Sequence, residues 1–184
     1  MSIWLIVLLV LLVLVAFFII STYNSLVGSR NKVKDQFSQI DVQLKKRFDL
    51  IPNLVETVKG YAKHESDTFE KVIQARNGYM NAKDDDGKIK ASKELSSGIS
   101  KIFALAENYP ELKANTNFVD LQNQLKDVEE KISYARQFYN DSVLIYNNKI
   151  EMFPSNIVAS IFHFTKESFF EASTEEKENV KVQF

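Results

Sequence analysis

The first feature of the chain is an unbroken run of apolar residues close to its N-terminus. Residues 3–20 (IWLIVLLVLLVLVAFFII) are all apolar, and no Asp, Glu, Lys or Arg occurs from Ser2 to Ser29. As a helix, this run of 18 residues rises about 27 Å, close to the ~30 Å hydrocarbon layer of a bilayer. The run therefore predicts a transmembrane helix, with Trp4 as an interfacial anchor at one end and the polar residues 21–24 at the other.

A cleaved signal peptide and a buried core helix are the alternatives for this run. A signal peptide has a basic start, a shorter apolar run and a small-x-small cleavage site, which this N-terminus lacks. A core helix usually keeps a polar face. The flanking charges predict the orientation, because Arg30, Lys32 and Lys34 follow the run and no side-chain cation precedes it. By the positive-inside rule, Met1 lies outside and the rest of the chain lies in the cytoplasm.

After the run, apolar residues recur in steps of three and four, as on one face of a helix. The first stripe is Val33, Phe37, Ile40, Leu44, Phe48 and Ile51. The second is Leu54, Val55, Val58, Tyr61, Ala62, Phe69, Val72 and Ile73. Between them stands Pro52, and proline is tolerated in the first turn of a helix but breaks its interior. With Asp49 as a cap, residues 49–52 predict a corner between two antiparallel helices.

Two more helices are expected after Asn77-Gly78 and the polar loop 81–87. The third stripe is Ile89, Leu95, Ile99, Ile102, Phe103 and Ala106. It stops before Pro110, because the residue ahead of a proline avoids helical geometry. The fourth forms a seam of coiled-coil type over residues 118–153: Phe118, Leu121, Leu125, Val128, Ile132, Ala135, Tyr139, Ser142, Tyr146, Lys149 and Phe153. We expect Thr116 or Asn117 to cap this helix.

These segments predict an all-α protein with four parts. Residues 1–29 form the transmembrane anchor and its collar, and residues 30–153 form an antiparallel bundle of about four long helices. Residues 154–170 contain a short apolar or amphipathic segment, and residues 171–184 form a polar, mostly acidic tail. Two roles stay open for the short segment: a cap on the bundle, or a contact with membrane or partner.

Composition removes several classes of function. With 23 Lys and Arg against 24 Asp and Glu, the chain has no basic excess for nucleic acid. It has no cysteine, so thiol catalysis and cysteine-bound zinc are excluded. His64-Glu65 begins a zinc-protease motif, but Thr68 stands where the second histidine is needed. Residues 84–87 (DDDG) resemble a calcium loop, but Lys93 occupies the position of its last ligand. We therefore predict no catalytic, metal or cofactor site.

Four stretches resemble the LemA family of bacterial membrane proteins. They are YNSLVGSRNKV from Tyr23, QIDVQLKKRFDLIPNLVETVKGYAKHE from Gln39, LAENYPELKANTNF from Leu105, and YARQFYNDSVLIYNNKIEMFPSNIVA from Tyr134. Phe37 and Phe48 stand where the family more often has tryptophan and tyrosine. The resemblance implies an N-terminal anchor, a mainly antiparallel helical bundle and a bacterial inner membrane. A related branch acts in forming magnetosome membranes, which implies a role in membrane organisation.

Surfaces are the remaining candidates for function. Candidate contacts with lipid or partner are Lys45, Lys46, Arg47, Tyr139, Asn140, Tyr146, Asn147, Ile157, Ile161, Phe162 and Phe164. Each has a plainer reading: the basic triplet as a solvated helix end, the tyrosines and asparagines as edge and register residues of the bundle. We predict a non-catalytic scaffold or adaptor that binds the bilayer and either a second copy or another membrane protein. The alternatives are a lipid-binding, membrane-remodelling factor and an enzyme with an unrecognised site.

Overall fold

The computed structural model describes residues 2–62 and 65–170, and within these ranges it contains helices and no strand. Six helices follow one another: α1 (Ile3–Lys59), α2 (Ser66–Asn81), α3 (Asp85–Ala106), α4 (Pro110–Lys113), α5 (Thr116–Glu151) and α6 (Ser155–Ile161). The predicted all-α class is confirmed. The acidic tail 171–184 and His64 lie outside the described residues.

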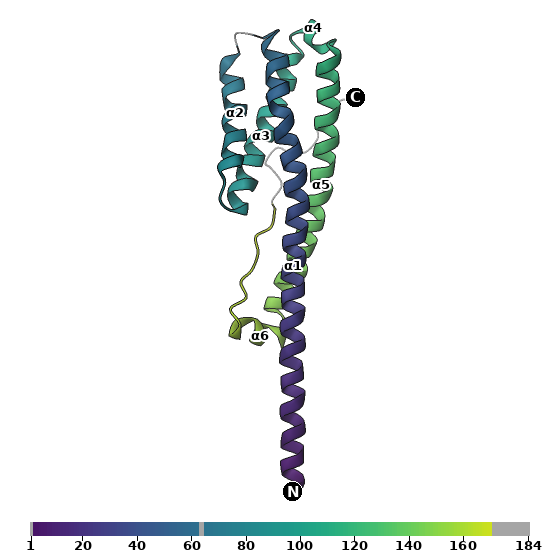
Figure 1. The fold of residues 1–184 in the computed structure, drawn as a ribbon, viewed down its shortest axis with the longest axis vertical. Helices are drawn as coiled ribbons and strands as arrows, with labels where there is room; N and C mark the ends of the chain where they lie inside the picture. Colours follow the sequence, from purple (N-terminus) through teal and green to yellow (C-terminus); the bar gives the residue numbers. More distant parts are fainter. Residues whose placement is uncertain (1, 63–64, 171–184) are drawn as a thin grey trace, which may run out of the picture. The chain divides into compact units, whose positions relative to one another are not determined.

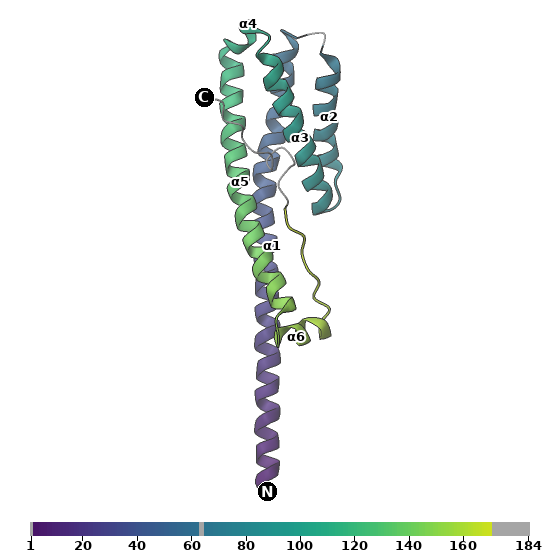
Figure 2. The ribbon, with the colours of Figure 1, turned by 180° about the vertical axis from the view of Figure 1, so that it is seen from behind.

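By its internal contacts the chain divides into two compact units. Of the described residues, we call those within 1–39 and 135–169 unit 1, and those within 40–134, together with Phe170, unit 2. Unit 1 contains the first part of α1, the end of α5 and α6. The end of α5 and α6 lie beside α1 just beyond its apolar start in Figures 1 and 2. Unit 2 contains the rest of α1 and α5, together with α2, α3 and α4.

The apolar N-terminal segment of α1 is long enough to cross a membrane. Among the described residues, α1 is the helix that meets both the length and the composition of a membrane span. None of its most apolar window is buried against other parts of the structure. In Figure 1 this segment, drawn in purple, extends without a helix beside it. An exposed apolar segment of this kind suits a lipid environment better than water.

The expected corner at residues 49–52 is wrong, because α1 continues through Pro52 to Lys59. The buried seam in fact runs past the proline without a change of period: Leu44, Phe48, Ile51, Val55, Val58 and Ala62. Pro52 itself is exposed, so its ring does not disturb this face. Proline removes the amide that would bond the carbonyl of Phe48. In unit 2 the Nε of Arg76 donates to that oxygen instead, at 3.3 Å.

The break between the first two helices occurs instead at residues 60–65, after Lys59 and before Ser66. The last part of the second stripe then belongs to α2, in which Phe69, Val72, Ala75 and Tyr79 are buried. Gly98 lets α3 pack closely on α2, because a Cβ there would lie 2.7 Å from Cγ2 of Val72. Figure 2 shows α2 and α3 side by side from the opposite direction.

The third and fourth stripes are largely buried. The α3 core residues are Ile89, Leu95, Ile99, Ile102 and Ala106. The α5 core residues are Phe118, Leu121, Leu125, Val128, Ile132, Tyr139, Ser142 and Tyr146. The expected cap of α5 is off by one residue, since the Oδ1 of Asn115 accepts from the amide of Phe118. Phe153, the last predicted seam position, is 80% exposed because α5 has already ended at Glu151.

Candidate functional site

The short apolar segment packs onto α1 immediately after the apolar run. Val158 and Ala159 of α6 are buried together with Leu26 of α1. Ile19, Ile150 and Phe164 pack around this cluster. Ile19 belongs to the apolar run itself, so α6 is held at the end of the predicted membrane span.

Aromatic rings extend this cluster along α1. The ring of Tyr23 lies 4.8 Å from that of Phe162 and 5.7 Å from that of Phe164, measured between centroids. The guanidinium of Arg30 lies over the ring of Phe164, 5.1 Å from its centroid. Tyr23 and Arg30 are seven residues apart and therefore share one face of α1. Aromatic side chains with one polar end are characteristic of membrane interfaces.

The other face of this region is apolar and exposed. Ile157, Ile161 and Phe162 are 51%, 59% and 46% exposed, and Met152 and Phe153, just before α6, are exposed as well. One face of α6 therefore packs on α1 through Val158 and Ala159, and the other face leaves Ile157 and Ile161 exposed.

The candidate residues on α5 hold the chain that follows α6. The side chain of Asn147 donates to the carbonyl of Glu167 at 2.9 Å and accepts from the amide of Glu167 at 3.0 Å. The hydroxyl of Tyr139 donates to the carbonyl of Ser168 at 2.9 Å, and its ring meets the edge of Phe37. Asn140 is half-buried. Tyr139 and Asn147 therefore contact a later segment of the chain itself, residues 167–168.

Tyr146 is buried at the centre of the same region. Burial, together with the negative charge of Glu167, raises the pKa of Tyr146 above its usual value, although Arg30 opposes the shift. The phenol therefore stays protonated at neutral pH, and its chief contribution is apolar packing with a polar tip.

Two cations of unit 1 are held without a carboxylate among the described residues. The ammonium of Lys149 donates to the hydroxyls of Ser25 and Ser29, at 2.8 and 2.7 Å. Arg30 contacts the ring of Phe164 and makes no ion pair with a described residue. In contrast, Lys166 pairs with Glu151. Arg30 follows the apolar run by only a few turns of α1. Lys149 lies against the same part of α1.

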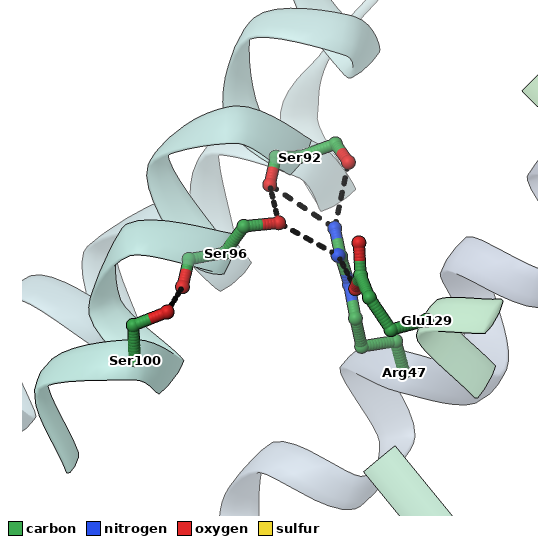
Figure 3. Close-up of polar contacts among 5 residues, drawn as sticks. All are labelled: Arg47, Ser92, Ser96, Ser100 and Glu129. Carbon is green, nitrogen blue, oxygen red and sulfur yellow. Dashed lines mark hydrogen bonds and ion pairs between the residues drawn. The ribbon is translucent and has the colours of Figure 1, made fainter. Parts of the chain in front are cut away.

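The basic triplet is divided between surface and interior. Lys45 and Lys46 are exposed, as expected for a solvated patch. Arg47 is fully buried in unit 2, so it does not belong to that surface. Its Nη1 donates to the hydroxyl of Ser96 at 2.9 Å and to Glu129 at 2.6 Å. Its Nη2 donates to the carbonyl and hydroxyl of Ser92 (Figure 3).

This arginine joins three helices of unit 2, since Arg47 lies on α1, the serines on α3 and Glu129 on α5. A guanidinium suits this position because it offers five donors in a fixed planar arrangement. The sequence did contain a signal for it. Arg47 stands three residues after Leu44 and four before Ile51, hence on the buried face, and Ser92, Ser96 and Ser100 repeat at helical spacing on α3.

A second polar cluster in unit 2 joins Asp41, Tyr79 and Lys88. Tyr79 and Lys88 donate to Oδ1 of Asp41 at 2.5 and 2.9 Å, and the Tyr79 ring stacks on Phe48. Partial burial opposes ionisation of Asp41, but these two hydrogen bonds and the charges of Lys88 and Lys45 hold its pKa below the usual value. Burial, followed by the bond to Asp41, raises the pKa of Tyr79 well above its usual range. At neutral pH Tyr79 therefore remains a protonated donor and Asp41 an ionised acceptor.

Unit 2 also has shallow grooves on its surface. One of about 400 Å³ runs beside Pro52 and is lined by Ile51, Pro52, Val55, Glu56, Lys59, Ile73 and Arg76. Another of about 450 Å³ is lined by Asn53, Glu56, Thr57, Asn117, Asp120, Leu121 and Gln124. Within the part of the chain that the structure describes, no three Asp, Glu or His side chains lie close enough to hold a metal ion.

Comparison with known proteins identifies the family. The model of the LemA family matches residues 36–184. The chain belongs to the LemA family. Protein LemA of Metamycoplasma hominis is 25% identical, over 85% of this chain and 72% of that protein. Magnetosome protein MamQ of Magnetospirillum gryphiswaldense is 24% identical, over 85% of this chain and 68% of that protein. Magnetosome protein MamQ 2 of Paramagnetospirillum magneticum is 23% identical, over 81% and 64%. The family resemblance noted in the sequence is confirmed.

Proposed function

We propose that this LemA protein is a membrane-anchored, non-catalytic scaffold or adaptor, which binds a second copy or another membrane protein. The observation that carries the proposal is the course of α1. Its first part has the length and composition of a membrane span, and its last part supplies core residues of unit 2. A protein whose anchoring helix also forms part of its folded core is suited to holding other proteins at a membrane.

The antiparallel bundle belongs to the same proposal. In unit 2, Asp41 of α1 contacts Tyr79 of α2, and Lys59 lies over the ring of Phe69. Residue numbers thus rise along α1 as they fall along α2. We infer that α1 and α2 run antiparallel there and that α3 and α5 complete a bundle of four long helices around Arg47.

A scaffold also agrees with the chemistry of the polar clusters. The contacts of Arg47 and Asp41 join helices within unit 2, which is a structural role. The similarity to magnetosome protein MamQ supports a role in organising membranes.

Photo-crosslinking in intact cells tests this function. Probes belong at exposed apolar positions, Val42 in unit 2 and Phe138 and Ile145 on α5, with the exposed polar Lys126 as control position. We expect adducts with a second copy or with one recurrent membrane protein, and few at Lys126. Lipid adducts alone would favour membrane remodelling. Adducts no more frequent or specific than those at Lys126 would contradict the scaffold proposal.

Topology is tested separately. We propose a single span in the bacterial inner membrane, with Met1 outside and the remaining chain in the cytoplasm. Because the chain has no cysteine, single cysteines can be introduced at Ser2 and at Lys126. A membrane-impermeant maleimide added to spheroplasts should label the first and spare the second. The reverse pattern would invert the orientation.

A further inference from the structure

The region around α6 combines features that are rarely found together on a water-exposed surface. Its inner face is fixed to α1 by Val158 and Ala159, and its outer face presents Ile157, Ile161 and Phe162. The apolar surface is continuous with the predicted span, since Ile19 packs in the same cluster and Tyr23 contacts Phe162. A helix of seven residues is far too short to cross a bilayer.

Distance along α1 sets the depth of this region. Tyr23 follows the apolar run by three residues and Leu26 by six, which is about 4.5 and 9 Å along the helix. The polar layer of a bilayer is roughly 5–8 Å thick on each side of the hydrocarbon. If the run crosses the hydrocarbon, Tyr23 lies within the headgroup layer and Leu26 at its outer edge. The cluster around α6, which includes Ile19 and Leu26 and adjoins Tyr23, therefore lies at the level of the lipid headgroups. A short helix with one apolar face is the form that lies in this layer.

Two cations, Arg30 and Lys149, lie near α6 at the same part of α1. Side chains on a helix lean toward its N-terminus, so Arg30 reaches back toward Tyr23 and the headgroup level. Lys149 is held on the same part of α1 by Ser25 and Ser29. Neither cation has a carboxylate partner among the described residues. Phosphate groups of anionic lipids are the partners that such a position offers.

We propose that α6, with Met152 and Phe153 before it, lies in the headgroup layer of the membrane that α1 crosses. Arg30 and Lys149 there bind the phosphate groups of anionic phospholipids. The proposal rests on the membrane anchoring proposed above and adds a second, interfacial contact next to the span.

The test uses tryptophan fluorescence of the full chain in vesicles. Trp4 is the only tryptophan, so Trp4→Phe gives a silent background for Ile161→Trp and for the control Met80→Trp, which is equally exposed on α2. Vesicles contain phosphatidylcholine whose acyl chains are brominated near the headgroup. We expect a blue-shifted emission and strong quenching for the tryptophan at 161, and neither at 80. Emission at 161 as red and unquenched as at 80 would overturn the proposal.

The unmodified chain separates this outcome from a failure of the anchor. If brominated chains quench Trp4 while the tryptophan at 161 stays unquenched, the span is inserted and only the role of α6 is wrong. If Trp4 is unquenched too, the anchoring on which the proposed function depends is wrong as well.

The lipid class is tested by moving the bromine to a different lipid. At equal mole fraction, brominated phosphatidylglycerol should quench the tryptophan at 161 more than brominated phosphatidylcholine, since each cation at a membrane surface enriches anionic lipid up to about fivefold. Arg30→Gln with Lys149→Gln should bring the two lipids to equal quenching. Lys46→Gln, which removes an exposed cation of unit 2, should leave the difference intact. Equal quenching by both lipids before any substitution would refute the anionic-lipid site.

Discussion

Arg76 donates a hydrogen bond from Nε to the carbonyl oxygen of Phe48, 3.3 Å away. Phe48 stands four residues before Pro52, so this is the carbonyl that the proline deprives of its helical donor. A side chain from α2 thus supplies the bond that α1 cannot make for itself. Tertiary structure thereby permits a proline in the interior of a 57-residue helix.

This relationship predicts coupling between Arg76 and Pro52. Arg76→Met should destabilise unit 2 by about 1–3 kcal/mol, because it removes a charged donor from a carbonyl that has no other helical partner. In a Pro52→Ala background the restored amide can bond to Phe48, and the same substitution should cost much less. Urea unfolding of the four proteins in detergent, followed by circular dichroism, gives the cycle. Equal costs in both backgrounds would show that Arg76 does not serve the proline.

Adjacent basic residues should differ sharply in their effect on stability. Arg47→Met should cost about 3–5 kcal/mol, because it leaves Glu129 and two serines without their buried partner. Lys46→Met should change the free energy of unfolding by less than about 0.5 kcal/mol, as is usual for an exposed side chain. Both variants keep an unbranched side chain and lose one charge, so each is the control for the other. Similar values for the two would mean that Arg47 is not the centre of the core network.

The Asp41 cluster predicts an acid-sensitive contribution to stability. Because the pKa of folded Asp41 lies below its reference value of 3.8, its contribution is fully present above that value. It is lost as the pH falls through the folded pKa. Asp41→Asn should therefore lower stability at neutral pH, by up to about 1 kcal/mol for a partly exposed pair. The difference from the unmodified protein should shrink toward zero in acid.

Urea unfolding across the acidic range measures this difference. Asp127→Asn, which removes the exposed pair with Lys131, should cost only about 0.3–0.5 kcal/mol. A constant difference between the Asp41 variant and the unmodified protein at every pH would contradict the assigned pKa shift.

Asn147 should control the chain segment after α6. Asn147→Leu removes both bonds to the backbone of Glu167, so the segment should open more often and trypsin should cut after Lys166 faster. The neighbouring substitution Asn148→Leu leaves both bonds in place, so trypsin should cut this variant at the original rate. Equal rates for the two variants would show that Asn147 does not hold this segment.

Two glycines should respond to alanine in opposite directions. Gly98→Ala places a Cβ 2.7 Å from Cγ2 of Val72 and should destabilise unit 2 by about 1–3 kcal/mol. Adding Val72→Ala removes that methyl and should reduce the cost of the alanine at 98. Gly28→Ala meets nothing within 4 Å and should stabilise α1 by roughly 0.5–1 kcal/mol. Thermal unfolding that shows no loss for Gly98→Ala, or no smaller loss when Val72→Ala is added, would contradict the close packing of α3 on α2.

The sequence by itself determined the helical class, the apolar span and most of the core. Spacing along one helix is a local property, and it correctly selected Ile40, Leu44, Leu125 and Ile132 as buried residues. The same period runs unbroken past Pro52, yet the proline predicts a corner there. This prediction is wrong because the penalty of a proline depends on what satisfies the carbonyl four residues before it.

Only the tertiary structure decided which polar residues are interior and which apolar residues are exposed. Arg47 and Lys46 are neighbours of the same charge, but Arg47 is buried and Lys46 is exposed. They differ because serines from α3 and Glu129 from α5 bind Arg47. Asn147 binds the backbone of Glu167, which belongs to a later segment. α6 packs on Leu26, which is more than a hundred residues away in the sequence. Whether a polar side chain is buried, and which residue it contacts, depends on such distant segments. The spacing of residues along one helix does not specify which segments these are.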